Sequence, residues 1–296
     1  MPCTSLKNDL HKNFLLALLI IVATFIGTAN FSSAQTVSND EQLLAAARDG
    51  KALVLGELLK SGANPQWRDK DGYDAFDYAI ERHQFDISQL LLKHALEHSQ
   101  KSEVDQQYVN AILNHQAMPN QSIATPIKIA LLRVLANQGK TAEVMQLIRA
   151  GLAVDAGAET GYTALALAVR WQHRELVTQL LQAGADPNMH TNSCYQTTAL
   201  MEASRDGNVE IAKQLISKSA KVNEPDRFGD HALNWAAFFG HLEFAQLLLA
   251  HGADLTRIGQ TDDNALDVAI RQGHSKLVEV LQKAGAKPHP KKAKAM

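Results

Sequence analysis

The sequence contains little cysteine, with only Cys3 and Cys194 among its 296 residues. Cys3 precedes the N-terminal apolar run, so it does not stand where a lipoprotein signal carries its lipid-bearing cysteine, and it would leave with a cleaved signal. The single cysteine that remains cannot form an internal disulfide. The folded chain is therefore expected to be held together by packing alone.

A surplus of basic residues is also absent. The formal charge of the whole chain is −2, and it becomes about −3 once Lys7, Asp9 and Lys12 are removed with the N-terminus. Binding to nucleic acid depends on clustered positive charge that neutralises phosphates, so no nucleic-acid partner is expected. The lysines of the basic tail at 289–296 are interpreted as a solvated chain end, because a short segment after the last repeat frays easily.

Motifs of catalysis are missing as well. The sequence has no Gly-x-Ser-x-Gly, no His-Glu-x-x-His, no Gly-x-x-x-x-Gly-Lys-Ser/Thr and no dinucleotide-binding glycine fingerprint. His190 and Cys194 are close in sequence, but a metal site needs a second pair of ligands at suitable spacing, which they lack. We therefore expect a protein that is not an enzyme and that has no cofactor and no metal.

One long apolar run is present, from Phe14 to Ala29, after a basic stretch and before Ser32-Ser33-Ala34. This order is typical of a secretory signal peptide, and we predict one at 1–34, with cleavage after Ala34 or, as second choice, after Ala29. A membrane-spanning helix needs roughly 20 strongly apolar residues, and this run has 16. The alternative is an uncleaved signal anchor in the inner membrane.

From residue 161 onward one pattern returns at a nearly fixed spacing. Ala-Leu pairs begin at 164, 199, 232 and 265, which are 35, 33 and 33 residues apart, and a Gly-Ala or Ser-Ala pair closes each unit. Within a unit, apolar residues recur at helical spacing, as in Leu176, Val177, Leu180 and Leu181. Each unit is therefore predicted to form two short antiparallel helices.

This pattern resembles the ankyrin repeat. The resemblance is carried by Gly161-Tyr162-Thr163-Ala164-Leu165, by Gly240-His241 and by the Leu-Leu-Ala-His-Gly-Ala-Asp sequence at 248–254. It implies an all-α solenoid of about seven helix-turn-helix repeats whose partners dock on the concave side, on the first helices and the fingers between repeats. The Pro and His of the family's Thr-Pro-Leu-His are replaced throughout. Because that His normally links neighbouring repeats, we expect a less stable stack than a consensus array.

The register breaks once. Phe76 and Leu132 open successive units 56 residues apart, so one period of 33 leaves 23 extra residues. We predict repeats 1–2 at 39–96, an irregular insert of a helix and a surface loop at 97–125, and repeats 3–7 at 126–288. In the fifth repeat the segment 190–196 is two residues longer than the period requires, and it is expected to bulge at an exposed finger.

Three histidines share the turn before a second helix: His173, His241 and His274. The first backbone N–H groups of a helix lack partners within it. We therefore expect these side chains to satisfy backbone groups at the start of their own helices.

By the resemblance, the fifth and sixth residues after each helix-opening residue face the concave side. These are Arg48, Asp49, Glu81, Arg82, Asn137, Gln138, Arg170, Trp171, Arg205, Asp206, Phe238, Phe239, Arg271 and Gln272. Most are polar, as a wet surface should be, but three are aromatic. Aromatic rings beside arginines are typical of interface hot spots. We predict a partner-binding surface of Arg170, Trp171, Arg205, Phe238, Phe239 and Arg271, with Tyr162, Arg227 and Phe228 from the fingers.

The alternative for these rings is that one or more of them pack into the core, as Trp235 is expected to do. With export and no disulfide framework, the sequence favours a monomer in the periplasm of a Gram-negative bacterium that binds another protein. Two alternatives remain open, a scaffold anchored in the inner membrane and an inhibitor or immunity protein of a secreted enzyme. A hydrolase in the insert ranks last, because the insert contains no nucleophile arrangement.

Overall fold

The computed structural model describes residues 38–98, 107, 109–110, 125–158, 161–193, 195–259 and 261–289. Within these residues all regular structure is helical, which confirms the predicted fold class. Seven helical hairpins follow one another: α2 (Asn39–Arg48) with α3 (Ala52–Lys60), α4 (Ala75–Glu81) with α5 (Phe85–Glu97), α7 (Thr125–Asn137) with α8 (Thr141–Arg149), α9 (Ala164–Arg170) with α10 (Arg174–Gln182), α11 (Ala199–Asp206) with α12 (Val209–Ser217), α13 (Ala232–Phe239) with α14 (Leu242–Ala250), and α15 (Ala265–Gln272) with α16 (Ser275–Lys283).

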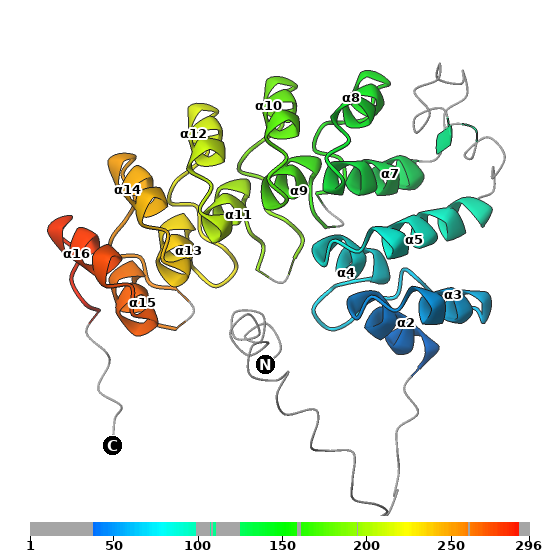
Figure 1. Ribbon diagram of the computed structural model, residues 1–296, viewed down its shortest axis with the longest axis horizontal. Helices are drawn as coiled ribbons and strands as arrows, with labels where there is room; N and C mark the ends of the chain where they lie inside the picture. Colours follow the sequence, from blue (N-terminus) through cyan, green and yellow to red (C-terminus); the bar gives the residue numbers. More distant parts are fainter. Residues whose placement is uncertain are drawn as a thin grey trace, which may run out of the picture.

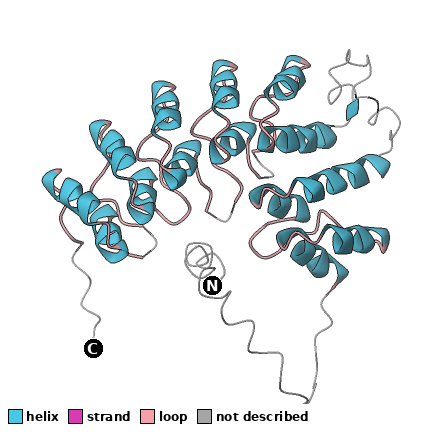
Figure 2. Cartoon of the chain, viewed as in Figure 1, coloured by secondary structure: helices cyan, strands magenta, loops and turns pink. Residues whose placement is uncertain are grey.

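The hairpins stand side by side in an arch (Figure 1). Helices α9, α11, α13 and α15 form its inner row, and α8, α10, α12, α14 and α16 form its outer row. The loops between hairpins project from the inner row into the hollow of the arch, as Figure 2 shows. The inner row and these loops therefore make up the concave side.

The predicted signal peptide, Cys194 and most of the insert and of the basic tail lie outside the described residues. The domain boundaries proposed from the sequence stay predictions. No helix in the described ranges combines the length and the apolar character that crossing a bilayer requires.

Polar caps and one buried leucine per hairpin explain why the repeats fold. The hydroxyl of Thr163 accepts a hydrogen bond from the N–H of Ala166 at 3.1 Å, and this cap starts α9. Leu165, Leu233 and Leu266 occupy equivalent places in successive hairpins, and each is at most 1% exposed. A hairpin can bury such a side chain only against its neighbours, so the repeats must stack.

The sequence predicted that the three turn histidines bond to the starts of their own helices, and the structure shows that they do not. Each reaches back to a carbonyl near the end of an earlier hairpin's first helix: His173 Nε2 donates to the oxygen of Asn137 at 2.9 Å, His241 to Arg205 at 3.0 Å, and His274 to Phe238 at 3.1 Å. Each imidazole extends across the gap between hairpins, where Nε2 meets a carbonyl that has no partner within its own helix. These histidines therefore link neighbouring repeats.

Two asparagines add a second set of links between repeats. Asn188 accepts from the N–H of Lys221 at 2.8 Å and donates to the carbonyl of Ser219 at 3.1 Å. Asn223 makes the same pair of bonds one repeat later, with the N–H of Asp254 and the carbonyl of Gly252. These bonds link neighbouring repeats although the histidine of the family's Thr-Pro-Leu-His is absent. That the stack is less stable than a consensus array stays a prediction.

The stack is irregular at one place. Helix α7 packs on α5 and α9 but touches α4 only lightly, whereas the first helices of the later hairpins pack regularly on one another. The Arg133 guanidinium of α7 instead bonds to the Asp77 carboxylate of α4, and both side chains are buried. Because the first helices do not pack closely here, the end of α4 comes near α9 and helps to form the site described next.

Candidate functional site

A hollow of about 650 Å³ opens on the concave side, and we call it the central hollow. Its lining residues come from the C-terminal end of α4, from α9, α11 and α13, and from the loop that precedes α11. Its lining consists of Glu81, Arg82, Tyr162, Arg170, Gln172, Ser193, Tyr195, Thr197, Glu202, Arg205, Asp206, Trp235, Phe239 and His241. The hollow therefore draws on several hairpins that are distant in sequence.

Buried charges form the floor of the central hollow. The Arg170 guanidinium lies between two carboxylates, with Nη2 3.4 Å from Glu81 Oε1 and Nη1 3.1 Å from Glu202 Oε2. The three side chains are only 10%, 8% and 3% exposed, respectively. Nη1 also donates to the Tyr162 hydroxyl at 3.2 Å, and the Thr197 hydroxyl donates to Glu202 Oε1 at 2.6 Å. This network joins α4, α9 and α11.

The two carboxyl groups of the floor differ in acidity. Burial raises the pKa of Glu81, and the attraction of Arg170 only partly offsets it. Burial also disfavours the charge of Glu202, but Arg170, Arg205 and the Thr197 hydroxyl together hold its pKa below the usual range. Glu202 is therefore the firmly ionised partner of Arg170, and Glu81 is the one that takes up a proton more readily.

Aromatic rings form one wall of the hollow. The ring centroids of Tyr195 and Trp235 are 5.5 Å apart, edge to face, and the Phe239 ring lies 6.3 Å from that of Trp235. Trp235 Nε1 donates to Asp226 Oδ2 at 3.1 Å, and the Phe228 ring packs edge to face on Tyr195 from outside the lining. Each ring is held by contacts within the fold. Tyr195 and Trp235 are only 7% and 6% exposed, so the half-buried Phe239 is the most accessible ring of the wall.

The rim of the hollow is polar. Arg205 pairs with Asp206, Nε to Oδ1 at 3.1 Å, and also reaches Glu202 with Nη1 at 3.5 Å. Arg82 is exposed at the end of α4, and no carboxylate of the described residues forms an ion pair with it. The rim thus carries one arginine that is occupied inside the fold and one that is available to a partner.

The structure brings together some of the residues predicted to bind a partner. Arg170, Arg205, Tyr162 and Phe239 all line the central hollow. Phe238 lies next to it, half-buried, with its ring 5.0 Å from that of Phe239.

The placement of Tyr162 and Arg170 corrects one part of the prediction. Tyr162 is only 2% exposed, so it is not an exposed finger residue. Its ring lies under the Arg170 guanidinium, 5.3 Å from centroid to Cζ. Arg170 is itself satisfied by internal carboxylates. Both residues therefore build the floor and cannot act as projecting contacts, because the irregular joint at α4 supplies Glu81 as an internal partner.

The other predicted residues lie outside the lining. Trp171 is half-buried, and its ring is tilted against that of His83 with the centroids 3.9 Å apart, while Phe228 packs behind Tyr195. Arg227 is exposed on the loop before α13. Arg271 of α15 pairs with Asp263 at 3.3 Å. That these four residues contact a partner stays a prediction, and none of them lines the central hollow.

Two signals in the sequence could have identified the hollow. Glu202 stands two residues after Leu200, where the other hairpins carry Leu167, Trp235 and Val268, so a charge occupies a core position. The loop 190–196, expected to bulge outward, instead places Ser193 and Tyr195 in buried positions on the wall. The two extra residues therefore build the site, because they give the loop enough length to fold inward against α11 and α13.

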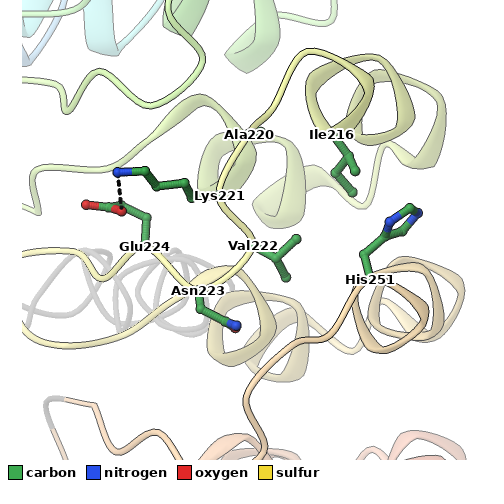
Figure 3. A pocket seen from close by; sticks show the side chains of 7 residues that line it. All are labelled: Ile216, Ala220, Lys221, Val222, Asn223, Glu224 and His251. Carbon is green, nitrogen blue, oxygen red and sulfur yellow. Dashed lines mark ion pairs between the residues drawn. The ribbon is translucent and has the colours of Figure 1, made fainter.

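A second hollow of about 470 Å³ lies between the C-terminal ends of α12 and α14 (Figure 3). Ile216, Val222 and His251 contribute to it, and Lys221 pairs with Glu224 at its edge, Nζ to Oε2 at 3.4 Å. It has no aromatic wall and no buried charge. Glu224 also lies 3.6 Å from His190 Nε2, and no group of three metal-ligating side chains occurs in the parts of the chain that the structure describes.

Comparison with known proteins gives matches over most of the second half of the chain. Residues 200–292 match the family model described as ankyrin repeats in three copies, and residues 160–192 match the model of the ankyrin repeat. The ankyrin repeat and KH domain-containing protein mask-1 of Caenorhabditis elegans is 30% identical over 185 residues, or 62% of this chain. The chain spans only 6% of the length of that relative.

Proposed function

We propose that this chain, of which residues 160–192 and 200–292 match ankyrin-repeat models, is a non-catalytic protein that binds another protein in the central hollow of its concave side. Stacked repeats contact only their neighbours, so they offer an extended open surface. Large aromatic rings and arginines dominate the energy of protein interfaces. The aromatic wall beside an available arginine is the observation that carries this proposal.

A catalytic use of Glu81 and Glu202 is the competing interpretation, since carboxyl groups with pKa values shifted in opposite directions can act as acid and base. Their geometry argues against it. Arg170 lies between them and bonds to both, and their side chains are almost fully buried. A substrate in the hollow would meet Arg82 and the rings before either carboxyl group, so the pair serves to hold three helices together.

Capture from an extract of the exporting cell tests the proposal. The immobilised chain is expected to retain a partner, and Phe239→Ala is expected to weaken its binding at least tenfold, because truncating a hot-spot ring costs about 2 kcal/mol or more. Leu53→Ala is the matched control, since Leu53 is 87% exposed on α3, far from the hollow. A partner retained equally by wild type and both variants would place the interface elsewhere.

We further propose that the chain is exported to the periplasm. The support is the order of basic, apolar and small residues over 1–34, which is that of a signal peptide. N-terminal sequencing of the protein from the exported fraction is expected to begin at Gln35, or at Asn30 if cleavage follows Ala29. An intact N-terminus in the membrane fraction would favour the anchored scaffold instead. A captured enzyme that loses activity on binding would make the chain an inhibitor.

A further inference from the structure

We infer that the central hollow binds an acidic segment of the partner, in which a carboxylate contacts Arg82 and a neighbouring aromatic or aliphatic side chain packs on Phe239 and on the edges that Tyr195 and Trp235 leave exposed. This inference rests on the proposed function and specifies the chemistry of the partner. It follows from which charges of the hollow are already paired inside the fold and which are not.

The carboxylates of the hollow are all occupied. Glu81 and Glu202 pair with the buried guanidinium of Arg170. Asp206 at the rim accepts from Arg205 Nε at 3.1 Å and from its Nη2 at 3.4 Å. A basic side chain of a partner would have to displace an internal arginine from one of these groups. A lysine or arginine is therefore a poor ligand for the hollow.

The arginines of the hollow differ in a way that favours an acidic ligand. Arg170 is buried, and Arg205 bonds to Glu202, to Asp206 and, through Nη2, to the Arg170 carbonyl at 3.5 Å. Arg82 has no ion pair with the described residues and is exposed beside the opening. A guanidinium presents paired donors that match the two oxygens of a carboxylate. Among the charged side chains that line the hollow, the one without an ion pair to the described residues is therefore positive.

The remaining surface selects for an apolar neighbour. The rings of Tyr195, Trp235 and Phe239 are fixed by mutual packing, so a ligand that covers them loses little conformational freedom of the protein. The volume of about 650 Å³ is within the range of roughly 300–1,000 Å³ typical of ligand sites. It suits a few adjacent side chains of an extended segment.

Peptide binding tests the inference. The probes are fluorescein-labelled hexapeptides with blocked ends and the sequence Ser-Gly-Phe-Z-Gly-Ser, in which Z is Glu, Gln or Lys, and binding to the full chain is followed by fluorescence anisotropy. Wild type is expected to bind the Glu peptide about tenfold more tightly than the Gln peptide, since a charge-assisted hydrogen bond contributes about 1.5 kcal/mol or more. The Lys peptide is expected to bind most weakly.

Variants assign the preference to the hollow. Arg82→Ala is expected to make the Glu and Gln peptides equal, and Arg82→Glu to place the Lys peptide first. Arg174→Glu is the matched control, because Arg174 is also an exposed arginine at a helix end but belongs to the outer helix α10, and it should leave the wild-type order intact. Phe239→Ala should weaken all three peptides together.

Each other outcome overturns the inference. A wild-type preference for Lys, a Glu preference that survives Arg82→Ala, or no binding of any peptide would each exclude the acidic segment as the ligand. These failures are distinguishable from failure of the proposed function. If the three peptides bind wild type with equal affinity but do not bind Phe239→Ala, the acidic ligand is excluded and the hollow remains a protein-binding site. If Phe239→Ala captures the partner as well as wild type does, the partner does not bind in the hollow and the proposed function fails.

Discussion

At the scale of single residues, the turn glycines and histidines of neighbouring hairpins fit one another. Gly139, Gly207 and Gly240 adopt positive φ, and a Cβ at each would lie 2.5 Å from the ring of His173, His241 or His274, respectively. Where Gln172 takes the glycine position with φ of 59°, the next hairpin carries Asn208, which caps its own helix by accepting from the N–H of Ile211. The glycine is therefore required by the ring as well as by the backbone.

Gly207→Ala is expected to destabilise the chain more than Gly273→Ala. Gly207 has a φ of 70° and Gly273 a φ of 77°. A Cβ at 273 would meet nothing within 4 Å, so Gly273→Ala measures the cost of backbone strain alone, which is about 1 kcal/mol. At 207 the clash with His241 adds to that strain. Urea unfolding of the two variants checks the difference, and equal losses in the free energy of unfolding would contradict the packing role of the histidine.

Asp74 gives a second prediction at this scale. Burial and the nearby Asp77 raise the pKa of Asp74 to about 6 from the ordinary 3.8, and the Arg68 guanidinium, with Nη2 2.8 Å from Oδ2, only partly offsets them. The folded state therefore binds a proton more readily than the unfolded state, and the free energy of unfolding falls as the pH rises from about 4 to about 6. Asp74 caps α4 by accepting from the N–H of Asp77 at 2.9 Å, a bond that asparagine can also accept.

Asp74→Asn removes this titration and keeps the cap. The free energy of unfolding of the variant, relative to that of wild type, is expected to be higher at pH 7 than at pH 4.5. At pH 7 only wild type has an ionised carboxylate at this buried position, and burial of that charge destabilises the folded state. Urea titrations of both proteins at the two pH values give the comparison. A relative stability that is constant or that falls with pH would show that Asp74 is ionised in the folded protein throughout.

At the scale of helices, the joint between the second hairpin and the later hairpins contains buried charges as well as apolar contacts. Arg133 pairs there with Asp77 and Arg170 with Glu81, while Ile80, Leu92 and Leu96 share one hydrophobic core with the helices from α7 onward. Removing one member of a buried pair leaves the other charge uncompensated, at a cost of about 3–5 kcal/mol. Removing one of these charges is therefore expected to weaken the contact between the first two hairpins and the rest of the stack.

Arg170→Ala is expected to separate the unfolding of α2–α5 from that of α7–α16. Repeat arrays lose cooperativity when one interface between neighbours weakens. Hydrogen exchange read by mass spectrometry at increasing urea should then show residues 39–97 losing protection before residues 164–283. Val268→Ala is the control, because it shortens a buried side chain within the regular part of the stack. Simultaneous loss of protection in Arg170→Ala would contradict the weak joint.

At the scale of the whole molecule, the solenoid could be predicted from the sequence, but the central hollow only in part. One buried leucine per period, such as Leu165, Leu233 or Leu266, is a local repeating signal, so the hairpins follow directly from it. The floor of the hollow depends on Arg170 meeting Glu81, 89 residues earlier in the chain, across an irregular joint. No periodic pattern encodes such a contact, so in the sequence Glu81 and Arg82 looked like ordinary solvent-exposed polar residues.

The proposed function requires a partner protein to lie against the aromatic wall of the concave side. Photo-cross-linking in the cell measures this most directly, with p-benzoylphenylalanine placed at Phe239 in one protein and at Leu53 in another. The Phe239 position is expected to form a covalent adduct with one partner, and the exposed Leu53 position is not. An adduct with the same partner from Leu53 alone would contradict it.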